Sequence, residues 1–552
     1  MVILLLAVLL APLATYSLFP PIVRFIGRSI GRSIQSKTHH RREILLNRAE
    51  ADERDASKKG LSPDASTSSS SSINEEEWEK VQKDASGLKT PTPDLKADVN
   101  DPSTFTGIIA FFHPFCNAGG GGERVLFAAI LATQKRYPRA LCVVYTGDHD
   151  ANKDQILTNV RNRFNISLNH ARVSFLYLST REYVLATKWP RFTLLGQSLG
   201  SLILGWEAFN LLTPDIYIDT MGYAFTLALS KFLFPKVPTG AYVHYPTIST
   251  DMLRSLHSST GSGQGVNAGL GKGLRGKAKQ CYWEFFAKLY SWVGGSVDVV
   301  MTNSTWTQNH VSSLWSRSRT ERHKKHAIAV VYPPCAVEEL QEKIPVSAAT
   351  EKSRTRNILY IAQFRPEKQH HLIIDAYAAF LKNVAPKIPN NQPSPKLILV
   401  GSVRDDHDEK RVYKLRLQAN EIKDHVEFVV NAKWPQVLEF LKSSNIGVNG
   451  MWNEHFGIGV VEYQAAGLIS VVNNSGGPKE DIVVDVDGGA TGFHASTPEE
   501  FAQGFAKALS LSPEETLAMR QRARKSSLRF SEAVFSDAWT SHLENLVDLI
   551  RK

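Results

Sequence analysis

The sequence predicts an α/β protein with two doubly wound, Rossmann-like domains that face each other across a cleft, preceded by an N-terminal membrane anchor. Short apolar runs rich in β-branched and aromatic residues alternate with helix-like stretches, and this alternation stops once and then restarts. Continuously apolar strands between helices indicate parallel sheets that are covered on both faces. The anchor is indicated by an uninterrupted apolar run at the N-terminus, which basic residues follow.

The N-terminal apolar run covers residues 2–19, about the length needed to cross a hydrocarbon core. A cleaved signal peptide is the alternative, but it would carry positive charge before the apolar stretch, and no side chain supplies that charge here. The basic side chains follow the run instead: Arg24, Arg28, Arg32, Lys37, Arg41 and Arg42. Because positive flanks stay in the cytosol, we expect residues 1–22 to be an uncleaved single-pass anchor with the downstream chain cytosolic.

Residues 23–104 are expected to form a basic segment followed by a disordered tether. Residues 50–104 contain a serine run, acidic clusters and several prolines. Such a composition cannot bury enough apolar surface to offset the entropy lost on folding. A second stretch, residues 258–279, is basic and glycine-rich and is expected to be a flexible loop inside the first domain.

The first domain is predicted over residues 105–335, the second over residues 336–530, and a C-terminal helix over residues 531–552. The first series of strand-like runs covers residues 107–113, 140–146, 173–178, 215–220, 240–245 and 297–303. The second series covers residues 357–363, 396–402, 425–431, 445–450 and 468–474. Two further apolar stretches, residues 194–206 and 223–234, are short for membrane spans and are expected to be buried helices. A position in the membrane interface is the alternative for one of them.

The composition is that of a globular protein with an excess of positive charge. The chain has 64 Lys and Arg against 54 Asp and Glu, a net charge of +10. Because the sequence has neither zinc-finger spacing nor an RNA-binding signature, nucleic acid is disfavoured, and an anionic membrane surface or a phosphate-bearing substrate is favoured. Four widely spaced cysteines are too few to cross-link 552 residues and are typical of a reducing compartment.

A glycine-rich turn follows the first predicted strand and leads directly into a predicted helix. It contains Gly120, Gly121 and Gly122. Such a turn presents backbone N–H groups and the positive end of a helix to an anion. Because it lacks both the GxGxxG spacing and a Walker lysine, a dinucleotide or ATP site is disfavoured. A tight turn without a ligand is the alternative interpretation.

Two glutamates of the second domain, Glu454 and Glu462, stand eight positions apart. Glu454 precedes a Phe-Gly turn, and Glu462 lies on the predicted helix after it. Eight residues of ideal helix leave their ends about 80° apart. Both carboxylates can still face one cleft, because Glu454 precedes the helix. Two unrelated surface glutamates are the alternative, which the surrounding glycines and apolar residues disfavour.

This E-x7-E pattern resembles the donor-site motif of the retaining GT-B glycosyltransferases of family 4. The glycine-rich turn, AQFRPEK at residues 362–368 and NNSGGP at residues 473–478 are similar to motifs of the same family. Within it, residues 111–126, 242–253, 447–454 and 476–483 resemble the α-1,2-mannosyltransferases that elongate the dolichol-linked oligosaccharide. The resemblance covers roughly residues 105–530.

The resemblance implies the activity and its partners. The α-1,2-mannosyltransferases that the chain resembles add the fourth and fifth mannoses from GDP-mannose to a dolichol-pyrophosphate-linked oligosaccharide. They do so on the cytosolic face of the endoplasmic reticulum and with retention of configuration. The expected partners are therefore GDP-mannose, the lipid-linked oligosaccharide and that membrane, with association among mannosyltransferases of the same pathway as a further expectation. A GT-B enzyme using another nucleotide sugar and a catalytically inactive scaffold subunit are the alternatives.

The resemblance also implies donor contacts in the second domain. Glu462 would accept hydrogen bonds from the ribose hydroxyls, because a carboxylate suits a vicinal diol. Glu454 and the amides of Phe456 and Gly457 would bind the donor sugar.

The leaving pyrophosphate requires cations, and Arg365 and Lys368 would supply them together with the glycine turns. The family usually reads GRxxxEK, whereas Gln363 stands at the arginine position here and Arg365 follows two residues later. Lys368 is therefore the firmer phosphate contact, and a surface salt bridge is the alternative for Arg365.

His244 ends a predicted strand of the first domain and is expected at the cleft, where α/β sheets bind ligands. With Glu454 and Lys368 it completes the predicted catalytic set, and with Tyr245 and Asp251 it is expected on the acceptor side. We expect His244 to position sugar, not to act as a base. A buried structural histidine is the alternative.

No metal and no other cofactor are expected. Asp-x-Asp, the metal motif of the other glycosyltransferase fold, occurs at residues 148–150, 406–408 and 485–487. Only the first closely follows a predicted strand, and it lies in the first domain, away from the donor motifs. All three are interpreted as solvated loops.

Overall fold

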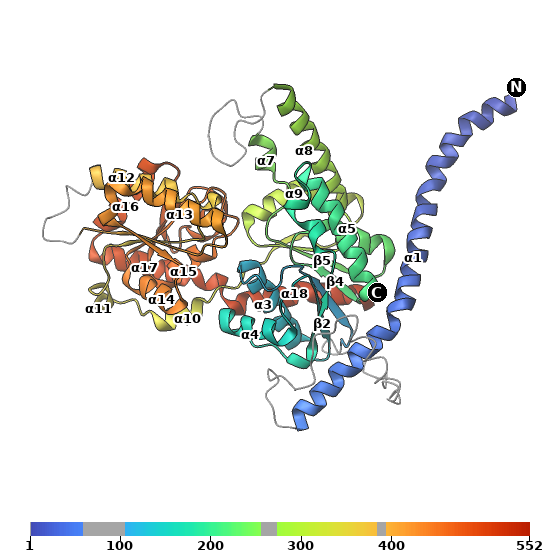
Figure 1. Cartoon of the computed structure of the whole chain (residues 1–552), viewed down its shortest axis with the longest axis horizontal. Helices are drawn as coiled ribbons and strands as arrows, with labels where there is room; N and C mark the ends of the chain where they lie inside the picture. Colours follow the sequence, from blue (N-terminus) through green and yellow to red (C-terminus); the bar gives the residue numbers. More distant parts are fainter. Residues whose placement is uncertain (1, 59–104, 256–272, 384–393, 552) are drawn as a thin grey trace.

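The protein consists of two α/β domains, each built on a parallel sheet, and a long N-terminal helix beside the first domain (Figure 1). The computed structural model describes residues 2–58, 105–255, 273–383 and 394–551 and, for residues 2–20, 254–255 and 273–275, the backbone alone. The two-domain prediction is confirmed. The expected tether over residues 59–104 lies outside the described residues.

The N-terminal sheet has the strand order β3-β2-β1-β4-β5-β6-β7, and every neighbouring pair is parallel. Its strands are β1 (Ile108–Phe112), β2 (Leu141–Thr146), β3 (Val173–Tyr177), β4 (Ile216–Asp219), β5 (Thr239–Val243), β6 (Val299–Thr302) and β7 (Ile328–Val330). Most of these residues are completely buried, which explains their continuous apolar character.

The C-terminal sheet has the order β10-β9-β8-β11-β12-β13 and is also parallel throughout. Its strands are β8 (Ile358–Ile361), β9 (Leu397–Gly401), β10 (Val426–Val430), β11 (Ile446–Asn449), β12 (Ile469–Asn473) and β13 (Gly492–Ala495). All predicted strands are present in the two sheets. The prediction omitted β7 and β13, which are the last strands of their sheets and are only three and four residues long.

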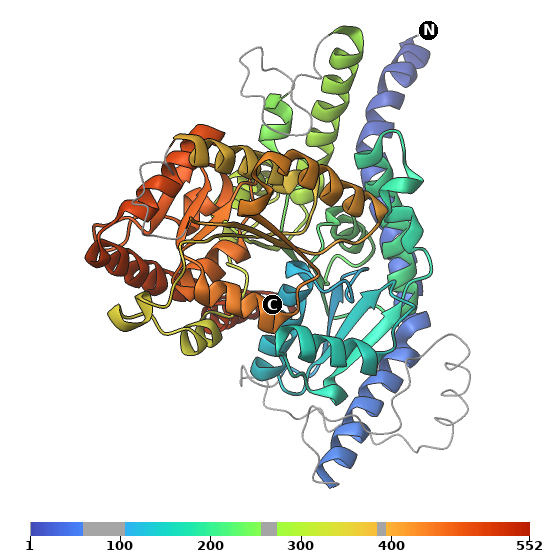
Figure 2. The same cartoon turned by 60° about the vertical axis from the view of Figure 1, so that its left-hand side comes forward.

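Helices cover both faces of each sheet (Figures 1 and 2). In the N-terminal domain they are α3 (Gly121–Arg136), α4 (Lys153–Phe164), α5 (Thr193–Leu211), α6 (Ala224–Leu233), α7 (Thr250–Ser255), α8 (Gly273–Gly294) and α9 (Thr305–Glu321). In the C-terminal domain they are α10 (Val337–Lys343), α11 (Ala348–Glu351), α12 (His370–Asn383), α13 (Asp406–Gln418), α14 (Trp434–Ser443), α15 (Ile458–Ala466), α16 (Pro498–Ser510) and α17 (Pro513–Ser527). Of the expected flexible loop, residues 258–272 lie outside the described residues, and residues 273–279 belong to α8.

The N-terminal helix α1 (Val2–Lys58) packs along the N-terminal domain with its second half (Figure 1). Ile34 and Leu45 are buried in the domain core. At Gly31 an added Cβ would lie 2.0 Å from the carbonyl oxygen of Leu233, so this close approach of α1 to α6 requires glycine. The expectation of a disordered tether from residue 50 was therefore wrong for residues 50–58, because they continue this helix and Glu53 pairs with Arg172 of the domain.

The expected anchor, residues 1–22, falls mostly on residues whose side chains lie outside the described part. Among the helices as far as they are described, none combines the length and the apolar character needed to cross a bilayer. The stretch 194–206 lies in α5, which is buried on one face only, since Leu199, Ile203 and Trp206 are exposed.

The chain passes between the domains twice. The first crossing leads from β7 to α10, and the second leads into the C-terminal helix α18 (Glu532–Arg551), which returns to the N-terminal domain and packs against α3 (Figure 1). The crossings run side by side, because the N–H of Cys335 donates a hydrogen bond to the carbonyl of Phe530 at 2.9 Å.

Candidate active site

The two domains meet where the glycine-rich turn of the N-terminal domain faces the start of α15. At Gly121 an added Cβ would lie 2.9 Å from Cδ1 of Ile458, and at Gly122 it would lie 3.8 Å from Nε2 of His244. The glycine turn, the end of β5 and the N-terminus of α15 therefore come together at one place, as predicted for a cleft between two sheets.

A buried polar network packs against the inner side of the glycine turn. The Glu123 carboxylate accepts a hydrogen bond from the N–H of Gly120, and His113 lies 3.5 Å from Glu123 and 2.9 Å from the hydroxyl of Thr220. Burial alone would raise the pKa of Glu123, but His113 and the Gly120 N–H outweigh it and hold this pKa below its usual value. This network was not predicted from the sequence, although Glu123 stands at capping-box spacing from Gly120.

Glu454 forms an ion pair with Lys368, at 2.5 Å between Oε2 and Nζ. Lys368 ends a short 3₁₀ turn after β8, and Glu454 follows β11, so two neighbouring strands of one sheet supply the pair. Burial would raise the pKa of Glu454, but the positive charge and the hydrogen bond of Lys368 hold it below its usual value. The carboxylate is therefore ionised at neutral pH.

Glu462 lies on α15 and has no such partner. Among the described residues it makes no hydrogen bond and no ion pair, although it is mostly buried. Burial raises the pKa of Glu462, and Arg124 of the N-terminal domain opposes this only in part. A largely buried carboxylate without a donor within the protein is costly unless a ligand supplies the hydrogen bonds.

The main chain between Glu454 and Glu462 offers N–H groups at the N-terminus of α15. The ring of Phe456 is buried against Tyr332 and Phe530, so only its backbone can serve a ligand. Among the described residues, the N–H groups of Phe456 and Gly457 donate to no acceptor. The N–H of Gly477 holds the segment in place by donating to the Glu454 carbonyl at 2.8 Å.

Arg365 lies between β8 and Lys368 and is half-buried. Its nearest carboxylate, Glu367, is 3.9 Å away, and its Nε hydrogen-bonds to none of the described residues. The guanidinium therefore keeps donors for a further anion.

His244 follows β5, and one of its ring nitrogens contacts the main chain that follows β4 in the same domain. Its Nε2 lies 3.1 Å from the carbonyl oxygen of Thr220, so Nε2 carries the proton and donates. Burial lowers the pKa of His244 to about 4. The imidazole is therefore neutral at pH 7, with the lone pair of Nδ1 not engaged by this contact.

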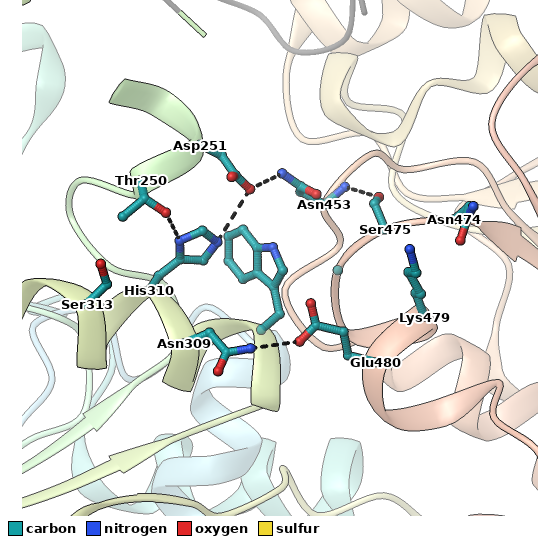
Figure 3. A pocket seen from close by; sticks show the side chains of 12 residues that line it. Thr250, Asp251, Asn309, His310, Ser313, Asn453, Asn474, Ser475, Lys479 and Glu480 are labelled. Carbon is teal, nitrogen blue, oxygen red and sulfur yellow. Dashed lines mark hydrogen bonds and ion pairs between the residues drawn. The ribbon is translucent and has the colours of Figure 1, made fainter. Parts of the chain in front are cut away.

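Of the three residues predicted on the acceptor side, Tyr245 and Asp251 contact the C-terminal domain. The ring of Tyr245 stacks on His455 with 4.1 Å between centroids. The Asp251 carboxylate accepts a hydrogen bond from Asn453 at 2.8 Å and pairs with His310 at 3.4 Å. Asp251, His310 and Asn453 line one side of a pocket of about 380 Å³ between the domains (Figure 3).

The three Asp-x-Asp segments are not all solvated loops. Asp148 is buried and pairs with Arg181, and residues 406–408 lie in α13, where Asp408 pairs with Arg404. Only residues 485–487 fit the expectation. No group of three potential metal ligands occurs within the described ranges.

Comparisons with known proteins agree with this geometry. Residues 106–315 match the family described as ALG11 mannosyltransferase N-terminus, and residues 341–526 match glycosyl transferases group 1. Among solved structures, alpha,alpha-trehalose 6-phosphate synthase from Burkholderia multivorans aligns over 80% of this chain and 99% of its own with a TM-score of 0.55. The sequence identity is 14%, so this likeness supports the two-domain GT-B fold alone.

Two relatives are similar over most of their length. The GDP-Man:Man(3)GlcNAc(2)-PP-Dol alpha-1,2-mannosyltransferase of Neurospora crassa is 57% identical over 542 residues, which cover 96% of this chain and 94% of the relative. The protein of the same name from Homo sapiens is 46% identical over 443 residues, which cover 80% and 87%. The chain therefore belongs to the family of GDP-Man:Man(3)GlcNAc(2)-PP-Dol alpha-1,2-mannosyltransferases.

Proposed function

We propose that this protein transfers mannose from GDP-mannose, in α-1,2 linkage, to the dolichol-pyrophosphate-linked oligosaccharide and thereby adds its fourth and fifth mannoses. The observation that carries the proposal is Glu462, a mostly buried carboxylate without a donor among the described residues, beside the open N–H groups that precede α15. A ribose diol would supply the donors that Glu462 lacks.

The side chains of the cleft divide the reaction between them. Lys368 and Arg365 meet the charge that develops on the leaving pyrophosphate, and Glu454, held by Lys368, binds the sugar hydroxyls. The proposal includes retention by front-face attack, in which the leaving phosphate accepts the proton of the acceptor hydroxyl. Neutral His244 contacts sugar and is not the base. Because cationic side chains cover the pyrophosphate, the proposal needs no metal or other cofactor.

The proposed location is the cytosolic face of the endoplasmic reticulum, with residues 1–22 as a single-pass anchor. Exposed apolar side chains of α5 and α8 support a position at a membrane surface: Leu199, Ile203, Trp206, Phe285 and Trp292. Association with other mannosyltransferases of the same lipid-linked oligosaccharide belongs to this proposal. Removing residues 1–22 should preserve GDP binding and reduce transfer to a membrane-embedded acceptor, whereas unchanged transfer would contradict the anchor.

The activity is tested by incubating membranes that contain the protein with GDP-mannose and the lipid-linked trimannosyl acceptor, followed by sizing of the product. We expect two successive mannose additions. Competition between GDP-mannose and UDP-sugars tests whether the chain uses another nucleotide sugar. No product despite GDP-mannose binding would favour the inactive scaffold.

A further inference from the structure

The pocket between the domains lies beside the reaction site and has no role in the donor contacts described above. Its N-terminal side is formed by α7 and α9, with Thr250, Asp251, Trp306, Asn309, His310 and Ser313. Its C-terminal side is formed by Asn453 and by residues 474–480 (Figure 3). Its volume of about 380 Å³ lies within the range of small-molecule binding sites.

The lining of this pocket is almost entirely polar. Trp306 is its single large apolar side chain, and its ring already contacts His310 and His455. A nucleobase or a lipid chain would find little apolar surface here, and Asp251 and Glu480 would repel a pyrophosphate. Hydroxyls, amides and carboxylates in one concave surface suit a polyol, whose hydroxyl groups both donate and accept hydrogen bonds.

One wall of the pocket is held in place by a chain of polar contacts across the domain boundary. The Thr250 hydroxyl lies 2.6 Å from Nδ1 of His310, whose Nε2 lies 3.4 Å from the Asp251 carboxylate. Asp251 accepts from Asn453 at 2.8 Å, and the Asn453 N–H donates to Ser475 at 2.7 Å (Figure 3). A wall fixed in this way loses little entropy when a ligand binds.

Other polar groups of the pocket lining have no partner among the described residues. Within the described part of the chain, the side chains of Ser313, Asn474 and Lys479 make no hydrogen bond and no ion pair, and all three are exposed. They come from both domains, so a ligand that bound all three would bridge the cleft.

The same short segment joins the pocket to the reaction site. Asn453 lines the pocket, and the next residue, Glu454, pairs with Lys368. His455 then stacks on Tyr245, which follows His244. A ligand in the pocket therefore lies directly behind the segment that binds the donor sugar.

We infer that this pocket binds mannose residues of the acceptor oligosaccharide next to the one that is elongated, with Asn309, Ser313, Asn474, Lys479 and Glu480 as contacts. The inference rests on the proposed function, because that function supplies the saccharide. It places acceptor recognition on α9 and on residues 474–480, beyond the residues predicted from the sequence.

The decisive variant is Ser313→Trp, which fills the pocket without removing a hydrogen bond. Ser316→Trp, at an exposed position of the same helix outside the pocket, is the matched control. With the full chain in detergent, Ser313→Trp should raise the KM for the lipid-linked acceptor about tenfold or more and leave the KM for GDP-mannose within about twofold, as loss of a contact region requires. Ser316→Trp should behave as the unchanged protein.

Binding of the free Man(3)GlcNAc(2) glycan, followed by ligand-observed NMR, separates this inference from the proposed function. Glycan binding that Ser313→Trp abolishes supports the pocket, even if the protein transfers no mannose and the proposed function fails. An unchanged acceptor KM in Ser313→Trp overturns the inference. So does a rise confined to the KM for GDP-mannose, because the pocket would then belong to the donor.

Discussion

The two walls of the cleft differ in charge. The C-terminal wall carries Lys368, Glu454 and Glu462, of which the first two neutralise each other and the third has no partner among the described residues. Beside the glycine turn, the N-terminal wall presents glycine backbone and neutral His244, and the Glu123 carboxylate points inward to His113. The Asp251 carboxylate of the same domain accepts its hydrogen bond from the amide of Asn453. The difference indicates a division of work in which charge binds the nucleotide sugar and neutral groups position the saccharide.

The largest effect is expected where the charge of the C-terminal wall is removed. Lys368→Ala leaves Glu454 without its cation and, under the proposed function, removes one of the two cations that meet the leaving pyrophosphate. Turnover should fall about 10²- to 10³-fold, the loss typical of one electrostatic group at a developing charge. Steady-state kinetics would measure this, with Lys382→Ala at an exposed position of α12 as the control. A loss below about threefold would show that Lys368 does not meet the developing charge.

The second prediction concerns the carboxylate without a partner. Glu462→Gln should weaken GDP-mannose binding about ten- to a hundredfold, because a hydrogen bond to a charged group contributes about 1.5–3 kcal/mol. The fold should tolerate the change, since no described residue bonds to Glu462. Calorimetric titration with GDP would measure the affinity, and Glu439→Gln, on the exposed side of α14, is the matched control. Equal affinities of the two variants would remove Glu462 from the donor site.

The sequence predicted the sheets well because completely buried parallel strands are almost continuously apolar, as in residues 140–146 and 468–472. It did not predict the docking of α1. There the composition is polar, and the signal is the spacing of Gly27, Gly31 and Ile34, which places small and apolar residues on one helical face.

The candidate site was predicted unevenly for a related reason. Glu454 and Glu462 belong to one local motif, so their proximity follows from eight positions of sequence. The contact of Asp251 with Asn453 joins residues about two hundred positions apart, and it depends on how the two domains meet. Asp251 could therefore be placed near the cleft from the sequence, but its partners could not.

A smaller effect is expected when neutral His244 on the N-terminal wall is replaced. His244→Ala removes a hydrogen bond between uncharged groups and should lower turnover about tenfold while GDP affinity stays the same. Turnover and GDP binding measured on the same preparation would test this. A loss of unfolding free energy of several kcal/mol would instead mark His244 as a structural residue of the core.

The smallest effect concerns pH. Lys368 lowers the pKa of Glu454, so this carboxylate stays ionised into acid, and replacing Lys368 raises that pKa. The acid limb of kcat/KM in Lys368→Ala should therefore move to higher pH relative to the unchanged protein, and it should stay in place in Lys382→Ala. Because His244 has a pKa of about 4, the unchanged protein should show no limb from this residue near pH 6.5. An acid limb of kcat/KM near pH 6.5 that His244→Ala abolishes would contradict a neutral His244.

The paired crossings between the domains have a mechanical consequence. The two chain segments that connect the domains, one leading to α10 and one to α18, lie side by side and form a single hinge. Rotation of one domain relative to the other about this hinge preserves the hydrogen bond between Cys335 and Phe530, whereas sliding of one segment past the other would break it. A rotation of this kind would separate Asp251 from Asn453 and return them to the same alignment.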